Sequence, residues 1–361
     1  MQFKTVFETK KRPIIIAGPC SAETEEQVLE TARALAEQKI DLFRAGIWKP
    51  RTRPNAFEGK GTLGLKWLKK VKEETGLKVT TEVANTQHVF EALKHGVDVF
   101  WLGARTTVSP FSVQEVADAL EGVDVPVLIK NPINPDLNLW LGAIERIYKA
   151  GITRIGVIHR GFSYHGDMKY RNAPRWQIPI ELKRRFPKLQ IICDNSHISG
   201  NRDLLEEVAQ RALDLNYDGI MTEVHTRPDD AWSDAKQQIT PFQFKELVER
   251  LVVRKPNTDD KNFLETLDHC RHEIDEIDEE LMNLLGARMK LSDSIGEYKK
   301  RNNIAILQSN RWNAILEKAI AQGTALGLSE EFVSVFLKAI HQESINHQAK
   351  VMNEEKVGID N

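Results

Sequence analysis

Up to about residue 250, short apolar runs rich in β-branched residues alternate with stretches in which apolar residues recur every three or four positions. The first pattern predicts buried strands and the second predicts amphipathic helices, so their alternation is typical of βαβ units around a parallel sheet. The runs predicted to be strands are residues 13–17, 42–45, 78–83, 97–102, 126–130, 154–158, 190–194 and 219–223.

Eight such units in this length indicate a closed (β/α)8 TIM barrel. An open, doubly wound sheet is the alternative fold. It usually has fewer strands, and its first turn often reads Gly-x-Gly-x-x-Gly, whereas the turn here reads Gly18-Pro19-Cys20. The barrel is therefore the favoured prediction.

Residues 251–262 break this alternation and are predicted to be a linker. From residue 263 to about 301, apolar residues continue at helical spacing without a proline, which predicts one very long helix, and two shorter helices are expected near 309–322 and 329–350. Since two short partners cannot cover the apolar stripe of so long a helix, we expect a homodimer through this all-α unit, or a larger assembly built from it. The expected domains are 1–250 for the barrel, 251–262 for the linker and 263–361 for the helical unit.

The composition restricts the possible partners and location of the protein more than it restricts the fold. A net charge of −2 gives no excess of positive charge for nucleic acid, so no nucleic-acid partner is expected. Three widely spaced cysteines suit a reducing cytoplasm better than a disulfide framework. The first apolar run stops at Gly18, too early for a signal peptide or a membrane span, so we expect a cytoplasmic protein without a membrane partner.

Charged and metal-ligating side chains gather where the predicted strands end. In a parallel barrel these ends form one mouth, where catalytic groups lie. So many cations at one mouth would repel each other unless they bound a polyanion, which predicts a substrate with phosphate and carboxylate groups. The residues expected there are Cys20, Arg44, Lys49, Glu82, Arg105, Lys130, His159, Arg160, His197, Glu223 and His225.

Four of the expected mouth residues suit a divalent transition metal. Cys20, His197 and Glu223 follow three different strands, and Asp234 lies a short loop beyond the last. Thiolate, imidazole and carboxylate ligands together leave Mn, Fe, Co and Zn open. Taken alone, Cys20 is as easily explained as a buried structural cysteine.

A series of motifs accompanies these strand ends. The strings AGPCSAE, FRAGIWKPRT, TEV, GART, VLIKNP, HRGF, CDNSH and MTEVH occur in this order over residues 13–240. They resemble the compact, barrel-only branch of the 3-deoxy-D-arabino-heptulosonate 7-phosphate (DAHP) synthases. The resemblance implies condensation of phosphoenolpyruvate with erythrose 4-phosphate, the first step of the shikimate pathway to aromatic amino acids. Another metal-dependent aldolase of phosphorylated sugars is the alternative, and the FRAGIWKPRT run argues against it.

The resemblance also implies roles for single residues. It makes the metal ligands Cys20, His197, Glu223 and Asp234, with manganese favoured, and it counts Lys49, Cys20 and His197 as catalytic. It places the phosphoenolpyruvate phosphate on Arg105, Lys130 and Arg160, its carboxylate on Arg44 and Lys49, and the erythrose phosphate on Arg51 and Thr52.

The helical tail carries cations at informative distances. Arg288 and Lys299 are eleven residues apart. This spacing is about three turns or ~16 Å on one face, so the two side chains can hold opposite ends of a small dianion. Arg271 lies ~25 Å further back along the helix and can reach such a site only from the partner of an antiparallel dimer. For any one of these cations, a solvated surface charge is the simpler interpretation.

The run CRHEIDEIDEELMNLLGARMKLSDSIGEYKK, followed by ILQSNRW and IHQESINHQ, resembles the all-helical class of chorismate mutases. The resemblance implies a rearrangement of chorismate to prephenate that needs no cofactor. It assigns the substrate carboxylates to Arg288 and the partner's Arg271, the ether oxygen to Lys299 and Gln348, and further binding to Gln308, Arg311 and Ser344. Trp312 and Gln308 depart from the family pattern, because some members place Glu and Asp there, the Glu near the substrate hydroxyl.

Two hypotheses for the tail remain open. It is either a working mutase or a dimerising module that senses prephenate or chorismate with little activity. The retention of Arg288, Lys299 and Gln348 favours the mutase, because a sensor does not need the ether-oxygen donors. The fusion also predicts allosteric regulation, in which a product of the tail such as prephenate inhibits the barrel.

Overall fold

The computed structural model describes residues 1–8, 13–50, 56–255, 257–307 and 309–353, and it leaves out the side chains of residues 309–311. The chain forms two compact units, Met1–Pro256 and Asn257–Asn361.

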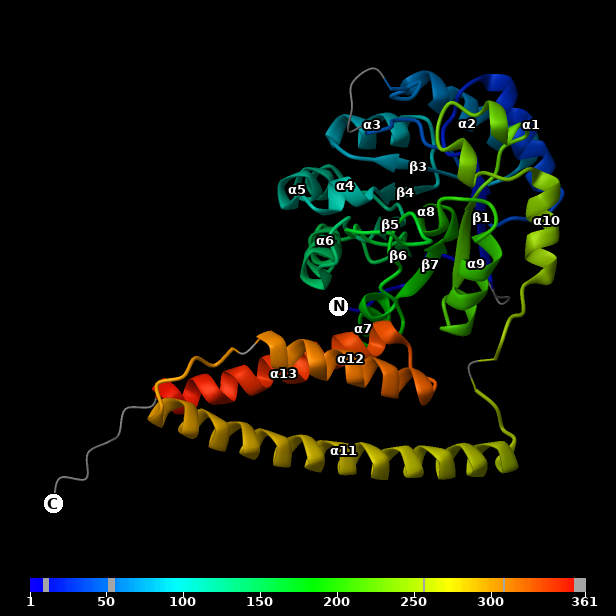
Figure 1. Cartoon of the computed structure of the whole chain (residues 1–361). Helices are drawn as coiled ribbons and strands as arrows, with labels where there is room; N and C mark the ends of the chain where they lie inside the picture. The colour runs from blue at the N-terminus through cyan, green and yellow to red at the C-terminus, as the bar shows by residue number, and fades with distance from the viewer. Residues whose placement is uncertain (9–12, 51–55, 256, 308, 354–361) are drawn as a thin grey trace. The chain divides into compact units, whose positions relative to one another are not determined.

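The first unit is a closed barrel of eight parallel strands in sequential order (Figure 1). The doubly wound alternative is wrong, because the first strand pairs with the last in parallel and so closes the sheet. All eight predicted strands are confirmed to within two residues at their ends. They are β1 (Ile14–Gly18), β2 (Leu42–Arg44), β3 (Val79–Val83), β4 (Val99–Leu102), β5 (Val127–Lys130), β6 (Ile155–His159), β7 (Gln190–Asp194) and β8 (Gly219–Glu223).

Helices surround the strands and bury one apolar face each against them (Figure 1). Side-chain oxygens start several of these helices by accepting hydrogen bonds from free backbone N–H groups, as Asp136 does at the start of α6 and Thr240 at the start of α10. The helices are α1 (Glu25–Ala36), α2 (Thr62–Thr75), α3 (Thr86–Lys94), α4 (Ala104–Thr107), α5 (Pro110–Ala119), α6 (Leu137–Lys149), α7 (Gln177–Arg185), α8 (Asn195–Ser199), α9 (Leu205–Asp214) and α10 (Pro241–Arg250).

The inside of the barrel is a packed apolar core. Large side chains from alternate positions of the strands fill it, including Ile16, Trp101 and Met221. Val6 and Phe7 of the N-terminal segment pack against this core, and their backbone N–H groups both donate to Oε1 of Gln190, at 2.8 and 3.1 Å. The interior of the barrel next to this segment is therefore apolar.

A cavity of about 830 Å³ lies at the N-terminal end of the strands, beside this segment. Two of its carboxylates already accept hydrogen bonds from the backbone. Asp41 accepts from the N–H of Ile15 at 2.7 Å, and Asp98 accepts from the N–H of Val79 and from Lys72, both at 2.8 Å. These carboxylates stabilise the starts of strands and leave little chemistry for a ligand.

The second unit consists of three helices, α11 (Lys261–Arg301), α12 (Ser309–Ala325) and α13 (Glu330–Asn353). The predicted long helix and its two shorter partners are thus confirmed. The long helix begins inside the segment expected to be linker, because Asp260 caps it by accepting from the N–H of Phe263 at 3.1 Å. Helix α13 packs against both α11 and α12.

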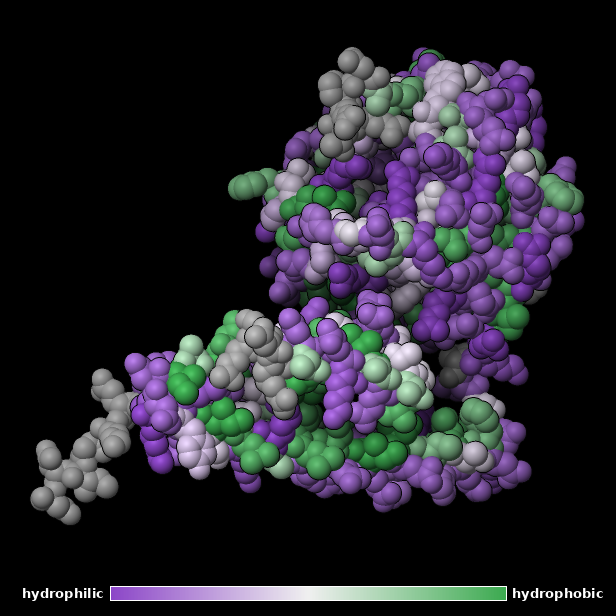
Figure 2. Space-filling view, viewed as in Figure 1, coloured by the Kyte–Doolittle hydropathy of each residue, from purple (hydrophilic) through white to green (hydrophobic). Residues whose placement is uncertain are grey.

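Large apolar side chains of α11 stay exposed in the single chain. Figure 2 shows hydrophobic atoms gathered along the helical unit, whereas the visible face of the barrel unit is mostly hydrophilic. The exposed apolar residues of α11 include Ile274, Ile277, Leu281, Leu284, Leu291 and Ile295. Among the described residues, none of the helices is long and apolar enough to cross a membrane.

Candidate functional site

A cavity of about 280 Å³ opens at the C-terminal ends of the barrel strands. The strands and the loops that follow them converge here, as the strand-end residues predicted. Its walls include all five of the cations assigned to phosphoenolpyruvate and two of the proposed metal ligands. These residues are Arg44, Lys49, Arg105, Lys130, Arg160, His197 and Asp234.

Arg44, at the end of β2, lies at the floor of this cavity. Its side chain is fully buried, and Nη2 lies 3.1 Å from Oε1 of Glu223. Burial alone would lower the pKa of Arg44, but the charges of Glu223 and Asp194 hold it above its usual value. Its Nε and Nη1 have no hydrogen-bond partner among the described residues. Buried donors of this kind destabilise a protein unless an anion accepts from them, so this end of the cavity suits a carboxylate.

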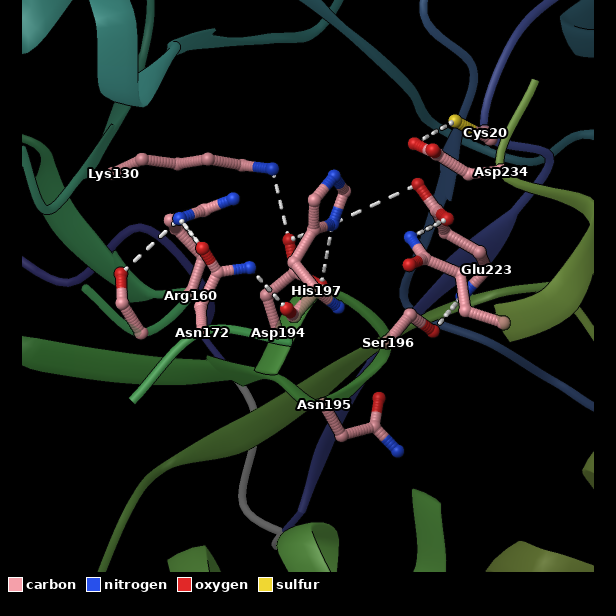
Figure 3. A network of polar contacts seen from close by, with 12 residues as sticks. Cys20, Lys130, Arg160, Asn172, Asp194, Asn195, Ser196, His197, Glu223 and Asp234 are labelled. Carbon is pink, nitrogen blue, oxygen red and sulfur yellow. Dashed lines mark hydrogen bonds and ion pairs between the residues drawn. The ribbon is translucent and has the colours of Figure 1, made fainter. Parts of the chain in front are cut away.

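Asp194, at the end of β7, joins a cation of the cavity to a proposed metal ligand (Figure 3). Its Oδ2 lies 2.8 Å from Nζ of Lys130 and 2.9 Å from Nδ1 of His197. Burial would raise the pKa of Asp194, but His197 and Lys130 hold it well below its usual value. The carboxylate therefore stays charged and fixes one ring nitrogen of His197, leaving the other for a ligand.

Cys20, Glu223 and Asp234 form a compact group of potential metal ligands, with ligand atoms within 4.8 Å of one another. Cys20 Sγ lies 3.4 Å from Oδ2 of Asp234 and 2.9 Å from Nζ of Lys49. His197 lies beside this group, with Nδ1 at 3.7 Å from Oε1 of Glu223.

The donor set fits a divalent cation. Glu223 is fully buried, and its Oε1 is close to the charge of Arg44 but accepts no well-aligned hydrogen bond from the described residues. Burial, together with the charge of Glu223, raises the pKa of Cys20 to about 12, so the cysteine is a thiol unless a cation stabilises the thiolate. Asp234 has a left-handed backbone with φ 49°, an unusual conformation for a residue with a side chain. Two carboxylates and a thiol converge here, and Oε1 of Glu223 is left for a cation to occupy.

The helical unit brings four predicted residues together between α11 and α13. Arg288 donates to Oγ of Ser344, and Nζ of Lys299 lies 3.0 Å from Oε1 of Gln348. Gly296 makes this approach possible, because a Cβ at that position would lie 3.0 Å from Cα of Gln348. We refer to Arg288, Lys299, Ser344 and Gln348 as the helical site.

The other residues predicted for chorismate lie elsewhere or outside the described part. Arg271 is exposed on α11 of its own chain, where Nη1 lies 3.3 Å from Oδ1 of Asp268. Gln308 is outside the described residues, and so is the side chain of Arg311, whose backbone belongs to α12. Their roles stay predictions.

Sequence profiles match both units. Residues 4–255 match the DAHP synthetase I family, and residues 270–349 match chorismate mutase type II. The chain belongs to the DAHP synthetase I family. With the second domain it is a bifunctional enzyme, a DAHP synthase (transferase) joined to a chorismate mutase (isomerase). It condenses phosphoenolpyruvate with erythrose 4-phosphate and rearranges chorismate.

Known proteins similar to this DAHP synthase barrel include a phospho-2-dehydro-3-deoxyheptonate aldolase from Thermotoga maritima. It is 33% identical over 237 residues, which are 66% of this chain and 68% of the relative. A crystal structure of a DAHP synthase from that organism superposes with a TM-score of 0.59 at 31% identity, covering 66% of this chain and 67% of the other. A 2-dehydro-3-deoxyphosphooctonate aldolase from Legionella pneumophila (strain Paris) is 29% identical, covering 68% of this chain and 94% of the relative.

The structure of the DAHP synthase barrel adds residues that the sequence did not reveal. Arg171 donates from Nη1 to Asp234 at 3.0 Å and to Oε1 of Gln237 at 2.6 Å. Asn172 accepts from Arg160 at 2.7 Å and donates to the carbonyl of His197 at 2.6 Å (Figure 3). The segment after β6 thus connects Arg160, a candidate for binding phosphate, to the metal-ligand candidates His197 and Asp234. No local pattern marks these two residues, because they lie in the middle of a loop.

Two histidines expected at the mouth have structural positions instead. His159 is fully buried, where Nε2 contacts the carbonyl of Pro174 at 2.6 Å and Nδ1 contacts Oη of Tyr217 at 3.0 Å. Burial lowers the pKa of His159 to about 3. His225 is also buried, and its Nδ1 accepts from the N–H of Arg227 at 2.9 Å. His159 points outward because successive side chains of a strand face opposite sides of the sheet, and neither histidine is among the residues that line the cavity.

The erythrose phosphate residues Arg51 and Thr52 lie outside the described residues. Glu82, also expected at the mouth, lies in the cavity wall and accepts from Nε1 of Trp101 at 2.9 Å.

Proposed function

We propose that the barrel holds phosphoenolpyruvate with its carboxylate on Arg44 and Lys49. The observation that carries this proposal is the pair of buried, unpartnered N–H groups of Arg44 among the described residues. The phosphate would bind the remaining cations of the cavity and the second substrate's phosphate would bind the segment after β2. The assigned residues are Arg105, Lys130 and Arg160 for the first phosphate and Arg51 and Thr52 for the erythrose phosphate.

The cations at the barrel mouth reduce the repulsion between the two substrates. Phosphoenolpyruvate and erythrose 4-phosphate are both anions, so they repel each other in water. Fixed cations in the cavity offset this repulsion and align C3 of phosphoenolpyruvate with the aldehyde carbon to which it bonds. Burial lowers the pKa of Arg160 to about 10, which still leaves it charged at neutral pH.

The proposed metal ligands are Cys20, His197, Glu223 and Asp234, and manganese is the first choice among Mn, Fe, Co and Zn. Support comes from the donor set and from the metal dependence of the DAHP synthase family. A bound divalent ion would polarise the aldehyde as a Lewis acid. Lys49 lies beside Cys20 Sγ, so its charge favours the thiolate that such an ion needs.

For the mutase, Arg288 and the partner's Arg271 are proposed to hold the two carboxylates of chorismate. Lys299 and Gln348 are proposed to donate to the ether oxygen of the breaking bond, and Gln308, Arg311 and Ser344 to complete the site. Donors fixed before the reaction stabilise the developing charge without a cofactor. The exposed apolar face of α11 supports an antiparallel homodimer, and a cytoplasmic location is proposed for the whole enzyme.

The test measures both activities on the full-length protein with and without a strong chelator. The expected result is that chelation stops phosphoenolpyruvate consumption in the presence of erythrose 4-phosphate, while chorismate loss continues unchanged. Restoring Mn²⁺ should recover the first activity. If the barrel stays inactive with every candidate metal, the proposed substrates are wrong. If chorismate is stable even without chelator, the tail is a sensing or dimerising module instead.

A further inference from the structure

His341 on α13 has an unusual environment in the helical unit. Its ring stacks on Trp312 of α12, with centroids 4.1 Å apart and planes inclined by 17°. The Nε2 atom is buried and has no hydrogen-bond partner among the residues that the structure describes. An imidazole nitrogen in that state destabilises the fold, because its hydrogen bond to water is lost and not replaced.

The ring belongs to the helical site by position. His341 precedes Ser344 by three residues and Gln348 by seven, so the three side chains share one face of α13. Burial, and then the charges of Arg288 and Lys299, lower the pKa of His341. The ring is therefore neutral and close enough to both cations to feel their charge.

Other histidines of the helical unit have acidic neighbours. Nδ1 of His347, on the same helix, lies 2.8 Å from Oδ1 of Asp293, and His269 and His272 lie near glutamates one turn on. His341 differs from these in facing two cations. A buried nitrogen beside the residues proposed to bind a substrate indicates that the substrate itself is its partner.

The chemistry of chorismate leaves one group to be bound. The molecule has two carboxylates, an ether oxygen and one ring hydroxyl. The proposed cations and Gln348 account for the carboxylates and the ether. A neutral imidazole nitrogen matches a neutral hydroxyl, which can both donate and accept a hydrogen bond.

We propose that His341 is a substrate-binding and specificity residue of the mutase, whose Nε2 hydrogen-bonds the ring hydroxyl of chorismate. This inference rests on the proposed mutase function of the helical site. Trp312 fixes the orientation of the ring by stacking on it. It also occupies a position where the sequence departs from relatives that have an acidic side chain near that hydroxyl, so His341 supplies the contact instead.

The test compares two substrates on the full-length enzyme and on His341→Phe. Phenylalanine keeps a ring to stack on Trp312 but has no nitrogen. For chorismate, kcat/KM should fall about tenfold, the effect of losing one substrate hydrogen bond. For a chorismate analogue that lacks the ring hydroxyl, kcat/KM should change less than about twofold, because no hydrogen bond is lost. His347→Phe is a matched change on the same helix. It should leave the ratio of kcat/KM for chorismate to kcat/KM for the analogue as in the unaltered enzyme.

Each other outcome overturns the inference in a different way. An equal loss on both substrates assigns His341 a packing role. An unchanged kcat/KM for chorismate shows that the nitrogen does not contact the substrate. An unaltered enzyme that leaves chorismate intact refutes the mutase function itself, and the inference with it, whereas the first two outcomes leave the mutase function standing.

Discussion

The guanidinium of Arg171 shows how a single loop residue supports the candidate metal group. It donates to Asp234 and Gln237, and Gln237 in turn donates to Oε2 of Glu223 at 2.6 Å. One side chain therefore orients two carboxylates that are proposed as ligands. Residues that hold metal ligands in place commonly change metal affinity when they are removed.

We predict that Arg171→Met weakens Mn²⁺ binding by about tenfold or more, because Asp234 loses the donor that orients it. Calorimetric titration of the metal-free protein measures this directly, without reference to turnover. Lys169→Met is the control, since Lys169 lies on the same loop but pairs with the exposed Glu207. Equal weakening in both variants would contradict the prediction and indicate a general effect of charge.

At this scale, sequence reasoning succeeds where a side chain directly follows a strand. Arg44 and Lys130 end β2 and β5, so the barrel itself brings them to the mouth. The position of Asp194 is also readable in the sequence, because an aspartate directly before a short helix caps it and so lies close to the histidine at its third residue. Arg171 and Asn172 offered none, since a loop's path depends on contacts distant in sequence.

The strands themselves were predictable because each is a short apolar run that the barrel buries on both faces. Their starts carry a further regularity. Asp41, Asp98 and Asp218 each stand immediately before a strand. Each accepts a hydrogen bond from the N–H of the first or second residue of the strand that comes before it in the barrel, as Asp41 does from Ile15. An aspartate directly before an apolar run therefore marks the start of a strand at three places in this chain.

His159 joins three elements, since it ends β6 and contacts Tyr217 before β8 and Pro174 before α7. Its pKa falls from 6.5 to about 3 through burial. The folded state thus binds no proton there while the unfolded state does, so its contribution to stability is full above pH 6.5 and is lost as pH falls towards 3.

We expect the free energy of unfolding of the barrel to fall by up to about 1.4 kcal/mol per pH unit below pH 6.5 because of this residue. Denaturant titrations at pH 7.5, 6 and 5 measure the slope. His159→Asn should flatten it, while His165→Asn, a change of an exposed histidine, should retain it. A variant at position 159 with the original slope would show that other groups govern the acid response.

For the whole molecule, the sequence predicted two enzymes in one chain because each unit has its own periodicity and its own motifs. It also predicted a dimer, from an apolar stripe that one chain leaves uncovered. What a single sequence cannot specify is how two copies or two units approach each other, since that depends on surfaces brought together only by folding.

Hybrid dimers test whether two chains share one mutase site. Arg271→Ala and Lys299→Ala should each be inactive alone. A hybrid with one copy of each, isolated by two different tags, should recover about half of the wild-type mutase rate, because one of its two sites is intact. Both variants should retain the DAHP synthase rate of the unaltered enzyme. Hybrids without mutase activity would mean that Arg271 acts within its own chain, and an active Arg271→Ala enzyme would mean that Arg271 does not act at the site.

The carboxylate of Asp194 has a consequence for the order of events at the barrel mouth. Asp194 bonds both Lys130 and His197. The ligands proposed for these two side chains, the phosphate of phosphoenolpyruvate and the metal, are therefore thermodynamically coupled in their binding. A phosphate that draws Lys130 away changes the charge that Asp194 presents to His197. By whatever factor phosphoenolpyruvate alters the dissociation constant of the metal, the metal alters that of phosphoenolpyruvate by the same factor.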